Sequence, residues 1–469
     1  GVGFIAATLA QLFLFRHSSG VIGLEKIGLV VLLQSILFLT RLLDIGAGPN
    51  LTRRLAAAHI AVDDPQFGRE VWSTLLSITV PTMLVSTLAL AGIVIWPQIV
   101  GAGQNETEVV TIAIALGVSG VLGSIVAILT AAHDGVGDLM ARGASLLFFA
   151  LAVVGCGVPL VAGLGALGYA MAVPAGLAVQ CTALSLNLVW LGARLRPGAW
   201  REVLTSARHQ LRDNLTLNGI SVCRLMFEPA TKYLLFMLGT LEIVAVFDVL
   251  NKVVTAVRAL VSSVMQPLLF KKSQQHAAGE STHNPGDQRI LHNVSLYLAA
   301  GAVASAPVIE ALLFGGNAVP DVTFILVILA ISSAINLSGQ IAYLNLLAMA
   351  AYGTLLRIHL AMVVTNLAVS ALFGALIGER GVVFGYAATM ALGGIALHLM
   401  GPRNTVTVPF RLVETAADVF ELLAIFGVTA IGLSLMSGSA FTLGWSITLT
   451  GVLGSAFLFT IARPLLQQK

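Results

Sequence analysis

The sequence predicts an all-α polytopic membrane protein with about 14 transmembrane helices. Hydrophobic residues make up 57% of its 469 residues and charged residues only 10%, whereas roughly a quarter of the residues in a soluble domain are charged. The mean hydropathy is +0.93. Apolar runs long enough to cross a ~30 Å hydrocarbon core recur along the whole chain. These runs are continuous rather than alternating, so they predict helices and not the strands of a membrane barrel.

The predicted spans are apolar runs that end at polar residues. They lie near 1–15, 27–47, 72–96, 109–132, 143–162, 165–192, 215–238, 243–269, 291–314, 321–348, 355–377, 382–400, 416–436 and 441–461. The first run is short for a span, so we expect residues to precede Gly1 in the natural chain.

Basic residues favour alternate connections between these spans. One set carries Arg53, Arg54, Arg69, Arg142 and the five arginines of 193–213, while the other set carries Arg16, Lys26 and Arg380. Cytoplasmic connections are enriched in lysine and arginine. The pattern therefore predicts that both termini are cytoplasmic and that the number of spans is even.

Similar features recur at a nearly constant distance along the chain, which indicates an internal repeat. Glu25 and Glu242 are 217 residues apart, as are Gly168-Tyr169-Ala170 and Gly385-Tyr386-Ala387, and Arg142 and Arg357 are 215 apart. Because six is an even number, both copies of a six-span unit are inserted in the same direction. The pseudo-twofold axis that relates the two copies then runs along the membrane normal. We expect lobes at 1–192 and 214–400, a basic cytoplasmic linker at 193–213 and two additional spans in 401–469.

Charged residues stand inside two consecutive predicted spans. Arg224, Glu228 and Lys232 are four residues apart, and Asp248 and Lys252 repeat that spacing before Arg258. Residues four apart share one face of a helix. A charge at bilayer depth costs several kcal/mol unless it faces a watery cavity or a partner, so these residues predict a functional site. The alternative is that they neutralise one another between packed helices.

The repeat distance adds a third pair of charges to this site. Arg258 lies 217 residues after Arg41, which stands near Asp44 in the span 27–47. We expect Arg41, Arg224, Lys232, Lys252 and Arg258 to bind an anionic substrate, and Asp44, Glu228 and Asp248 to balance charge or couple transport to Na⁺ or a proton. The alternative interpretation of Arg41 and Asp44 is that their side chains extend to the membrane–water interface.

Motifs in both halves support a family resemblance. Glu25-Lys-Ile-Gly28, Asp44-Ile-Gly46 and the Arg53-Arg54 pair resemble the opening of Wzx-type polysaccharide flippases, which belong to the multidrug/oligosaccharidyl-lipid/polysaccharide exporter superfamily. Asp248-Val-Leu-Asn-Lys252 with Arg258 is similar to the polar eighth span of that family. The resemblance implies a two-lobed fold of fourteen helices in the bacterial cytoplasmic membrane.

The same resemblance implies the cargo and the partners. The cargo would be an undecaprenyl-diphosphate-linked oligosaccharide that moves from the inner to the outer leaflet by alternating access. Membrane lipids and other polysaccharide-assembly proteins are the expected partners. No cofactor is expected.

Other functions are less compatible with the sequence. It has no Gly-x4-Gly-Lys-Ser/Thr nucleotide loop, no basic block interleaved with aromatic residues for nucleic acid, and histidines without metal-ligand spacing. We therefore expect that the protein is not an enzyme. The alternatives are a cation-coupled multidrug exporter of the same superfamily, a major facilitator transporter and a membrane polysaccharide polymerase. An excess of five cations over three carboxylates in the predicted site favours an anionic cargo.

Overall fold

A computed structural model describes residues 2–38, 47–57, 60–95, 106–196, 199–277, 291, 294–295, 297, 299–302, 304–315, 321–349 and 351–399. Every regular element in these ranges is a helix, as the sequence predicts. The chain forms two compact units, Gly1–Val246 and Phe247–Lys469, which are described separately below.

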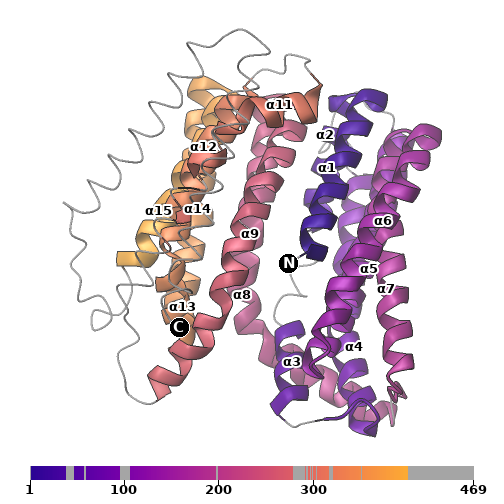
Figure 1. The fold of residues 1–469 in the computed structure, drawn as a ribbon. Coiled ribbons are helices and arrows are strands. Elements are labelled where there is room, and N and C mark those ends of the chain that lie inside the picture. Colours follow the sequence, from indigo (N-terminus) through magenta and orange to yellow (C-terminus); the bar gives the residue numbers. More distant parts are fainter. Residues whose placement is uncertain are drawn as a thin grey trace, which may run out of the picture. The chain divides into compact units, whose positions relative to one another are not determined.

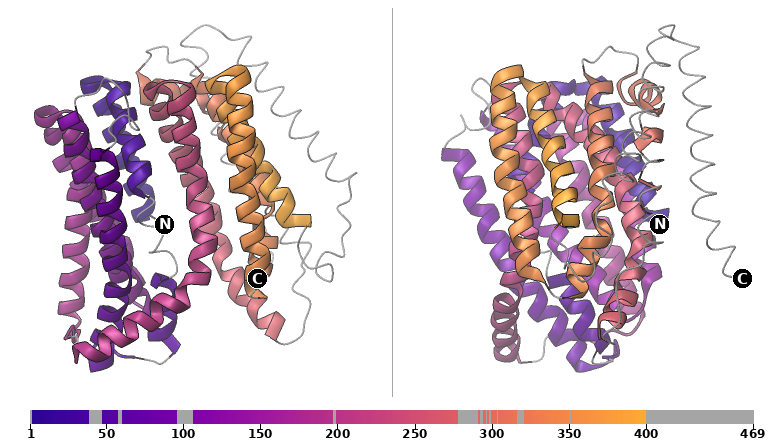
Figure 2. Two further views of the ribbon diagram at one scale, coloured as in Figure 1. Left: turned by 180° about the vertical axis from the view of Figure 1, so that it is seen from behind. Right: turned by 90° about the vertical axis from the view of Figure 1, so that its left-hand side faces the viewer.

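Unit 1 contains eight described helices and the first residues of a ninth. They are α1 Val2–Ile22, α2 Leu24–Phe38, α3 Ala47–Ala57, α4 Pro65–Ile95, α5 Glu106–Gly135, α6 Leu139–Leu164, α7 Ala166–Trp190, α8 Trp200–Leu238 and the beginning of α9 Leu241–Ala277. α6 and α7 pack as a hairpin, α1 lies on α6, and α5 packs against α7, α4 and α3 (Figures 1 and 2).

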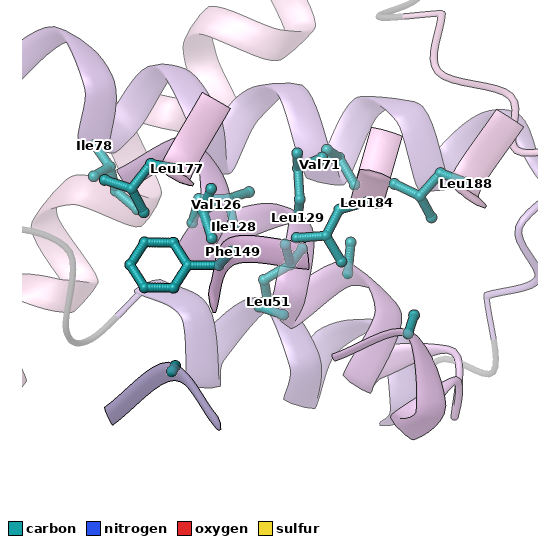
Figure 3. Packing of buried hydrophobic residues seen from close by; sticks show 14 of the residues in the cluster. Leu51, Val71, Ile78, Val126, Ile128, Leu129, Phe149, Leu177, Leu184 and Leu188 are labelled. Carbon is teal, nitrogen blue, oxygen red and sulfur yellow. The ribbon is translucent and has the colours of Figure 1, made fainter. Parts of the chain in front are cut away.

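The core of unit 1 lies where α3, α4, α5, α6 and α7 meet. Figure 3 shows Leu51, Val71, Leu129, Phe149 and Leu184 in contact there. The opposite faces of these helices expose apolar side chains: Leu84 is 62% exposed. Apolar residues on both the inner and the outer faces are typical of a bundle in lipid, where close packing, rather than exclusion of water, holds the helices together.

The arginine-rich connections of unit 1 gather at one end of the bundle. Arg54 Nε lies 2.9 Å from Glu70 Oε2, and the Arg194 amide donates to the Val62 carbonyl at 2.9 Å. Lys26 marks the other end, 3.2 Å from Glu108. Within unit 1 the basic residues thus divide between the two ends as the alternating pattern predicts. Which end is cytoplasmic stays a prediction.

Unit 2 contains the remainder of α9 together with α11 Ala306–Phe314, α12 Val322–Ser338, α13 Gln340–Ala348, α14 Tyr352–Ile377 and α15 Glu379–Leu399. α14 and α15 pack side by side as a hairpin, and α12 packs against α15 (Figure 2). α12 and α13 meet at Gly339 with a bend of 42°. A Cβ on Gly339 would lie 2.7 Å from the Gly394 carbonyl oxygen of α15, so a glycine is needed at this break.

The two hairpins repeat one local geometry. Gly165 turns α6 into α7 at φ 58°, and Gly378 ends α14 at φ 68° before α15. A Cβ on Gly168 would lie 1.9 Å from the Leu160 carbonyl oxygen, and one on Gly381 would lie 2.0 Å from that of Phe373. These equivalent glycines are 213 residues apart, whereas the Gly-Tyr-Ala motifs are 217 apart, so the motif lies one helical turn deeper in α15.

The predicted spans correspond to helices wherever the structure describes them, although several bounds differ and a turn at Ser305 interrupts the span 291–314. Residues 47–57 form the separate helix α3, the span 321–348 is broken at Gly339, and helix α8 begins at Trp200, within the predicted linker. Seven described helices have the length and composition to cross a membrane, or up to eight if α12 and α13 form one span. The total of fourteen, the lobe boundaries and the pseudo-twofold axis stay predictions, and 401–469 lie outside the described residues.

Candidate functional site

The first part of the candidate site is the ion pair on α8. Glu228 Oε1 lies 2.5 Å from Lys232 Nζ, so the predicted spacing of four residues does bring the two charges together. The Lys232 side chain is 6% exposed and that of Glu228 38%. The carboxylate thus faces the accessible side of this pair. Pro229 follows Glu228 and has no N–H to donate, so the Leu225 carbonyl loses its usual helical donor.

The second part is the ion pair on α9, where the accessible partner is the cation. Asp248 Oδ2 lies 2.6 Å from Lys252 Nζ, and the exposed fractions of the two side chains are 2% and 35%. The buried carboxylate holds the lysine to the helix by a charge-assisted contact. Because the ammonium is partly exposed, it retains donors that can reach an approaching anion.

Arg258 lies further along α9 and contacts α15. Its Nη1 lies 3.9 Å from the Sδ atom of Met390. Ser332 Oγ of α12 lies at the same distance from that sulfur, and Asn336 Nδ2 donates to the Met390 carbonyl at 2.9 Å. Met390 therefore joins the arginine to α12 just before its break at Gly339. A thioether sulfur is a weak acceptor for a guanidinium.

A second polar contact between α9 and α15 lies beside the Asp248–Lys252 pair. The Tyr386 hydroxyl donates to Asn251 Oδ1 at 3.3 Å, and the Tyr386 ring packs edge-on against Phe247 with 5.2 Å between centroids. All three residues are buried. Their contacts set the rotation of α9 about its axis, and hence the direction of Lys252. The repeated Gly-Tyr-Ala motif was the sequence signal for Tyr386, although its role at the site was not predicted.

The structure tests the other predicted site residues to different degrees. It describes the backbone of Arg224 in α8 but not its side chain, and Arg41 and Asp44 lie outside the described residues. The expectation that Arg41 and Arg258 both bind the substrate therefore stays a prediction.

The predicted repeat gives no charged counterpart to the α9 pair. At the repeat distance of 217, Asp248 corresponds in sequence to Val31 of α2, and Lys252 corresponds to Ser35. Val31 is 1% exposed, and the Ser35 hydroxyl donates to the Val31 carbonyl at 2.8 Å, within its own helix. At this repeat distance the α9 pair has no charged counterpart in α2.

The carboxylates of these pairs are also the groups that a coupling ion would use. Among the described residues, no three histidine, cysteine, aspartate or glutamate side chains converge as metal ligands do. Coupling to Na⁺ or a proton through Glu228 or Asp248 stays a prediction.

Together, the helical hairpins, the broken helix and the charge pairs of α8 and α9 define a class of protein, a multi-pass membrane protein with the fold of the MurJ and MATE transporters. Comparison with solved structures supports this class. An inward closed structure of the lipid II flippase MurJ covers 99% of this chain and 99% of its own, with a TM-score of 0.69 at 12% identity.

Transporters of the multidrug resistance MATE family share the fold as well. An inward-facing MATE transporter of the MOP superfamily has a TM-score of 0.64 at 15% identity and covers 85% of this chain and 97% of its own. The eukaryotic MATE transporter AtDTX14 has a TM-score of 0.55 at 14% identity, with coverages of 90% and 96%. No family model matches the chain, and no curated protein matches it by sequence. At these identities the likeness shows the fold alone.

Proposed function

We propose that the protein is a flippase that moves an undecaprenyl-diphosphate-linked oligosaccharide from the inner to the outer leaflet of the bacterial cytoplasmic membrane. The observation that carries the proposal is the asymmetry of the α9 pair, in which the Asp248 carboxylate is buried and the Lys252 ammonium is partly exposed. Such a pair presents a cation to its surroundings, and a diphosphate is the part of this cargo that cannot cross hydrocarbon without one.

In the proposed transfer, the diphosphate shares the Lys252 ammonium with Asp248. The diphosphate carries roughly two negative charges, and its oxygens accept from Lys252 while Asp248 still holds the same ammonium. Arg258, further along α9, supplies a planar donor fork for a second phosphate oxygen. The sugars follow the head group through the protein by alternating access, and the lipid tail stays in the bilayer.

The MurJ likeness supports this reading, since that protein is described as a lipid II flippase and shares the fold over 99% of both chains. The MATE likeness supports a second candidate, a cation-coupled multidrug exporter. Glu228, the accessible member of the α8 pair, favours that candidate because a carboxylate can attract a cationic drug. The two candidates differ in the sign of the cargo.

The test replaces the lysine and measures flipping. In cells that depend on this protein for surface glycan, Lys252→Met should lower the outer-leaflet exposure of lipid-linked oligosaccharide at least tenfold, and Lys252→Arg should retain part of it. Lys26→Met is the matched control, because Lys26 also pairs with a carboxylate, Glu108, but lies at an end of the bundle.

A second variant separates function from folding. Lys252→Met leaves the buried Asp248 carboxylate without its lysine, which costs about 3–5 kcal/mol. Asp248→Asn/Lys252→Met removes both charges, so it should reach the membrane in normal amounts and still fail to flip. Normal flipping by this double variant would overturn the proposed role of the α9 pair.

A further inference from the structure

A cluster of exposed arginines and apolar side chains surrounds the turn from α7 to α8. We name it the α8 basic patch, and it consists of Arg194, Arg196, Arg201, Arg208, Trp190, Trp200 and Leu204. Trp190 is 83% exposed, Trp200 52% and Leu204 58%. The proposed transport function uses none of these residues.

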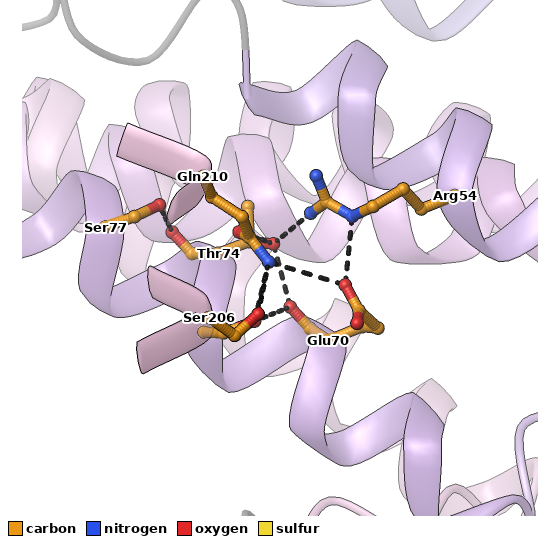
Figure 4. Close-up of polar contacts among 7 residues, drawn as sticks. Arg54, Glu70, Thr74, Ser77, Ser206 and Gln210 are labelled. Atoms are coloured by element: carbon orange, nitrogen blue, oxygen red, sulfur yellow. Dashed lines mark hydrogen bonds and ion pairs between the residues drawn. The ribbon is translucent and has the colours of Figure 1, made fainter. Parts of the chain in front are cut away.

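The inner side of this segment is fixed to α4. Val203, Ala207 and Gln210 are buried, and Gln210 Nε2 donates to Ser73 Oγ at 2.9 Å. The same amide joins the network around Glu70, whose carboxylate Arg54 of α3 also contacts (Figure 4).

The turn before α8 is held in the same way. Trp72 Nε1 donates to the Leu195 carbonyl at 2.6 Å, and the Trp72 ring packs edge-on against Trp200. A Cβ on Gly68 would lie 2.3 Å from the Arg194 carbonyl oxygen, so this close approach requires glycine. The arginines therefore project from a backbone that is fixed on its protein side.

The outer face of α8 presents a row of basic and apolar side chains. Arg201, Leu204 and Arg208 lie on one stripe of the helix, at spacings of three and four residues. The one carboxylate of this turn of helix, Glu202, lies 3.3 Å from Arg69. None of the four arginines of the patch forms an ion pair with a residue that the structure describes.

The patch lies at the end of α7 and beside the start of the apolar part of α4. α7, which has the length and composition of a span, ends at Trp190, and the apolar part of α4 follows Arg69 and Trp72. Tryptophan is enriched at the membrane–water boundary. Exposed apolar side chains between arginines therefore meet lipid head groups at this end of the bundle.

We propose that the α8 basic patch binds acidic phospholipid head groups of the adjacent leaflet. Trp190, Trp200 and Leu204 enter the boundary region, while the guanidinium groups contact lipid phosphates, which accept their paired donors. Each basic residue near an anionic membrane surface strengthens binding about fivefold, and salt weakens the effect. This surface anchors the α7–α8 connection independently of the cargo.

The test measures which lipid stays with the purified protein. The full chain is reconstituted in vesicles of equal parts phosphatidylglycerol and phosphatidylcholine, extracted gently, and its retained lipids are quantified by mass spectrometry. The wild type should enrich phosphatidylglycerol, and Arg201→Gln/Arg208→Gln should lose most of that enrichment, up to about 25-fold for two arginines. Arg201→Lys/Arg208→Lys should keep it, and 0.5 M salt should reduce it.

The matched control is Arg142→Gln/Arg357→Gln, which removes the same charge from two exposed sites elsewhere on the chain and should leave the enrichment unchanged. Equal loss in this control would overturn the proposal by showing a non-specific charge effect. Equal retention of both lipids by the wild type would also overturn the proposal and would favour an acidic protein as the partner of the patch.

Discussion

His133 shows how a single buried residue joins three helix ends in unit 1. Its side chain is fully buried, with Nδ1 3.1 Å from Asp138 Oδ2 and Nε2 3.1 Å from the Leu184 carbonyl oxygen. Both ring nitrogens of His133 therefore have an oxygen partner, one from a side chain and one from the backbone. Asp138 also caps α6 and accepts from Asn187 of α7.

His133→Ala should therefore destabilise the protein strongly. It removes the partner of a carboxylate and of a buried carbonyl, and we expect a loss of about 2–3 kcal/mol in the free energy of unfolding. Thermal unfolding of the purified protein in detergent measures it. Arg142→Ala, which removes the nearby exposed ion pair with Asp134, should change the stability by less than about 1 kcal/mol; a similar loss in both variants would contradict the account.

The sequence predicted local pairs at the candidate site and missed distant ones. Glu228 with Lys232 and Asp248 with Lys252 follow from a spacing of four residues, which fixes proximity on any helix. The contact of Arg258 with Met390 joins residues 132 apart in the chain, and its formation depends on how α9 and α15 pack. Helix spacing alone carries no information about such contacts.

At the scale of elements, glycines determine how closely the helices approach. Gly28, which belongs to the family-like motif before the second predicted span, lies in α2 against the first residue of α9. A Cβ at this position would lie within 1.8 Å of the Leu241 carbonyl oxygen. The motif glycine thus has a packing role at the α8–α9 turn.

Gly28→Ala should separate α2 from this turn and cost about 1–3 kcal/mol, because a backbone carbonyl must move to admit the new methyl group. Gly20→Ala is the matched control, since a Cβ there meets nothing within 4 Å. In the control, alanine should leave the stability unchanged or raise it by about 0.5–1 kcal/mol. Thermal unfolding of both variants provides the comparison, and an unchanged midpoint for Gly28→Ala would refute this role.

The boundaries of the elements were predicted where polar residues interrupt apolar runs, and were wrong where helices continue in water. α8 begins at Trp200 because the polar residues after Pro197-Gly198 are good helix formers that pack on α4. Hydropathy does not detect such a segment. The break at Gly339 was missed because both sides of it are apolar, and its cause is the close crossing with Gly394.

At the scale of the whole molecule, the fold indicates the class of protein, whereas the charged residues bear on the sign of the cargo. The fold class follows from composition and continuous apolar runs, and the likeness to MurJ at a TM-score of 0.69 confirms it at 12% identity. MATE transporters share the fold, so the architecture does not distinguish an anionic lipid from a cationic drug. In the proposed function the distinction depends on the charge pairs of α8 and α9.

The central claim is that this protein transfers a lipid diphosphate across the bilayer. The most direct measurement reconstitutes the purified protein in vesicles that contain undecaprenyl-diphosphate-linked oligosaccharide and follows its exposure to a membrane-impermeant pyrophosphatase added outside. The account predicts that the wild type makes the inner-leaflet cargo accessible, while Asp248→Asn/Lys252→Met leaves it protected as in vesicles without protein. Continued protection with the wild type, together with uptake of an organic cation by the same vesicles, would contradict the account and favour a multidrug exporter.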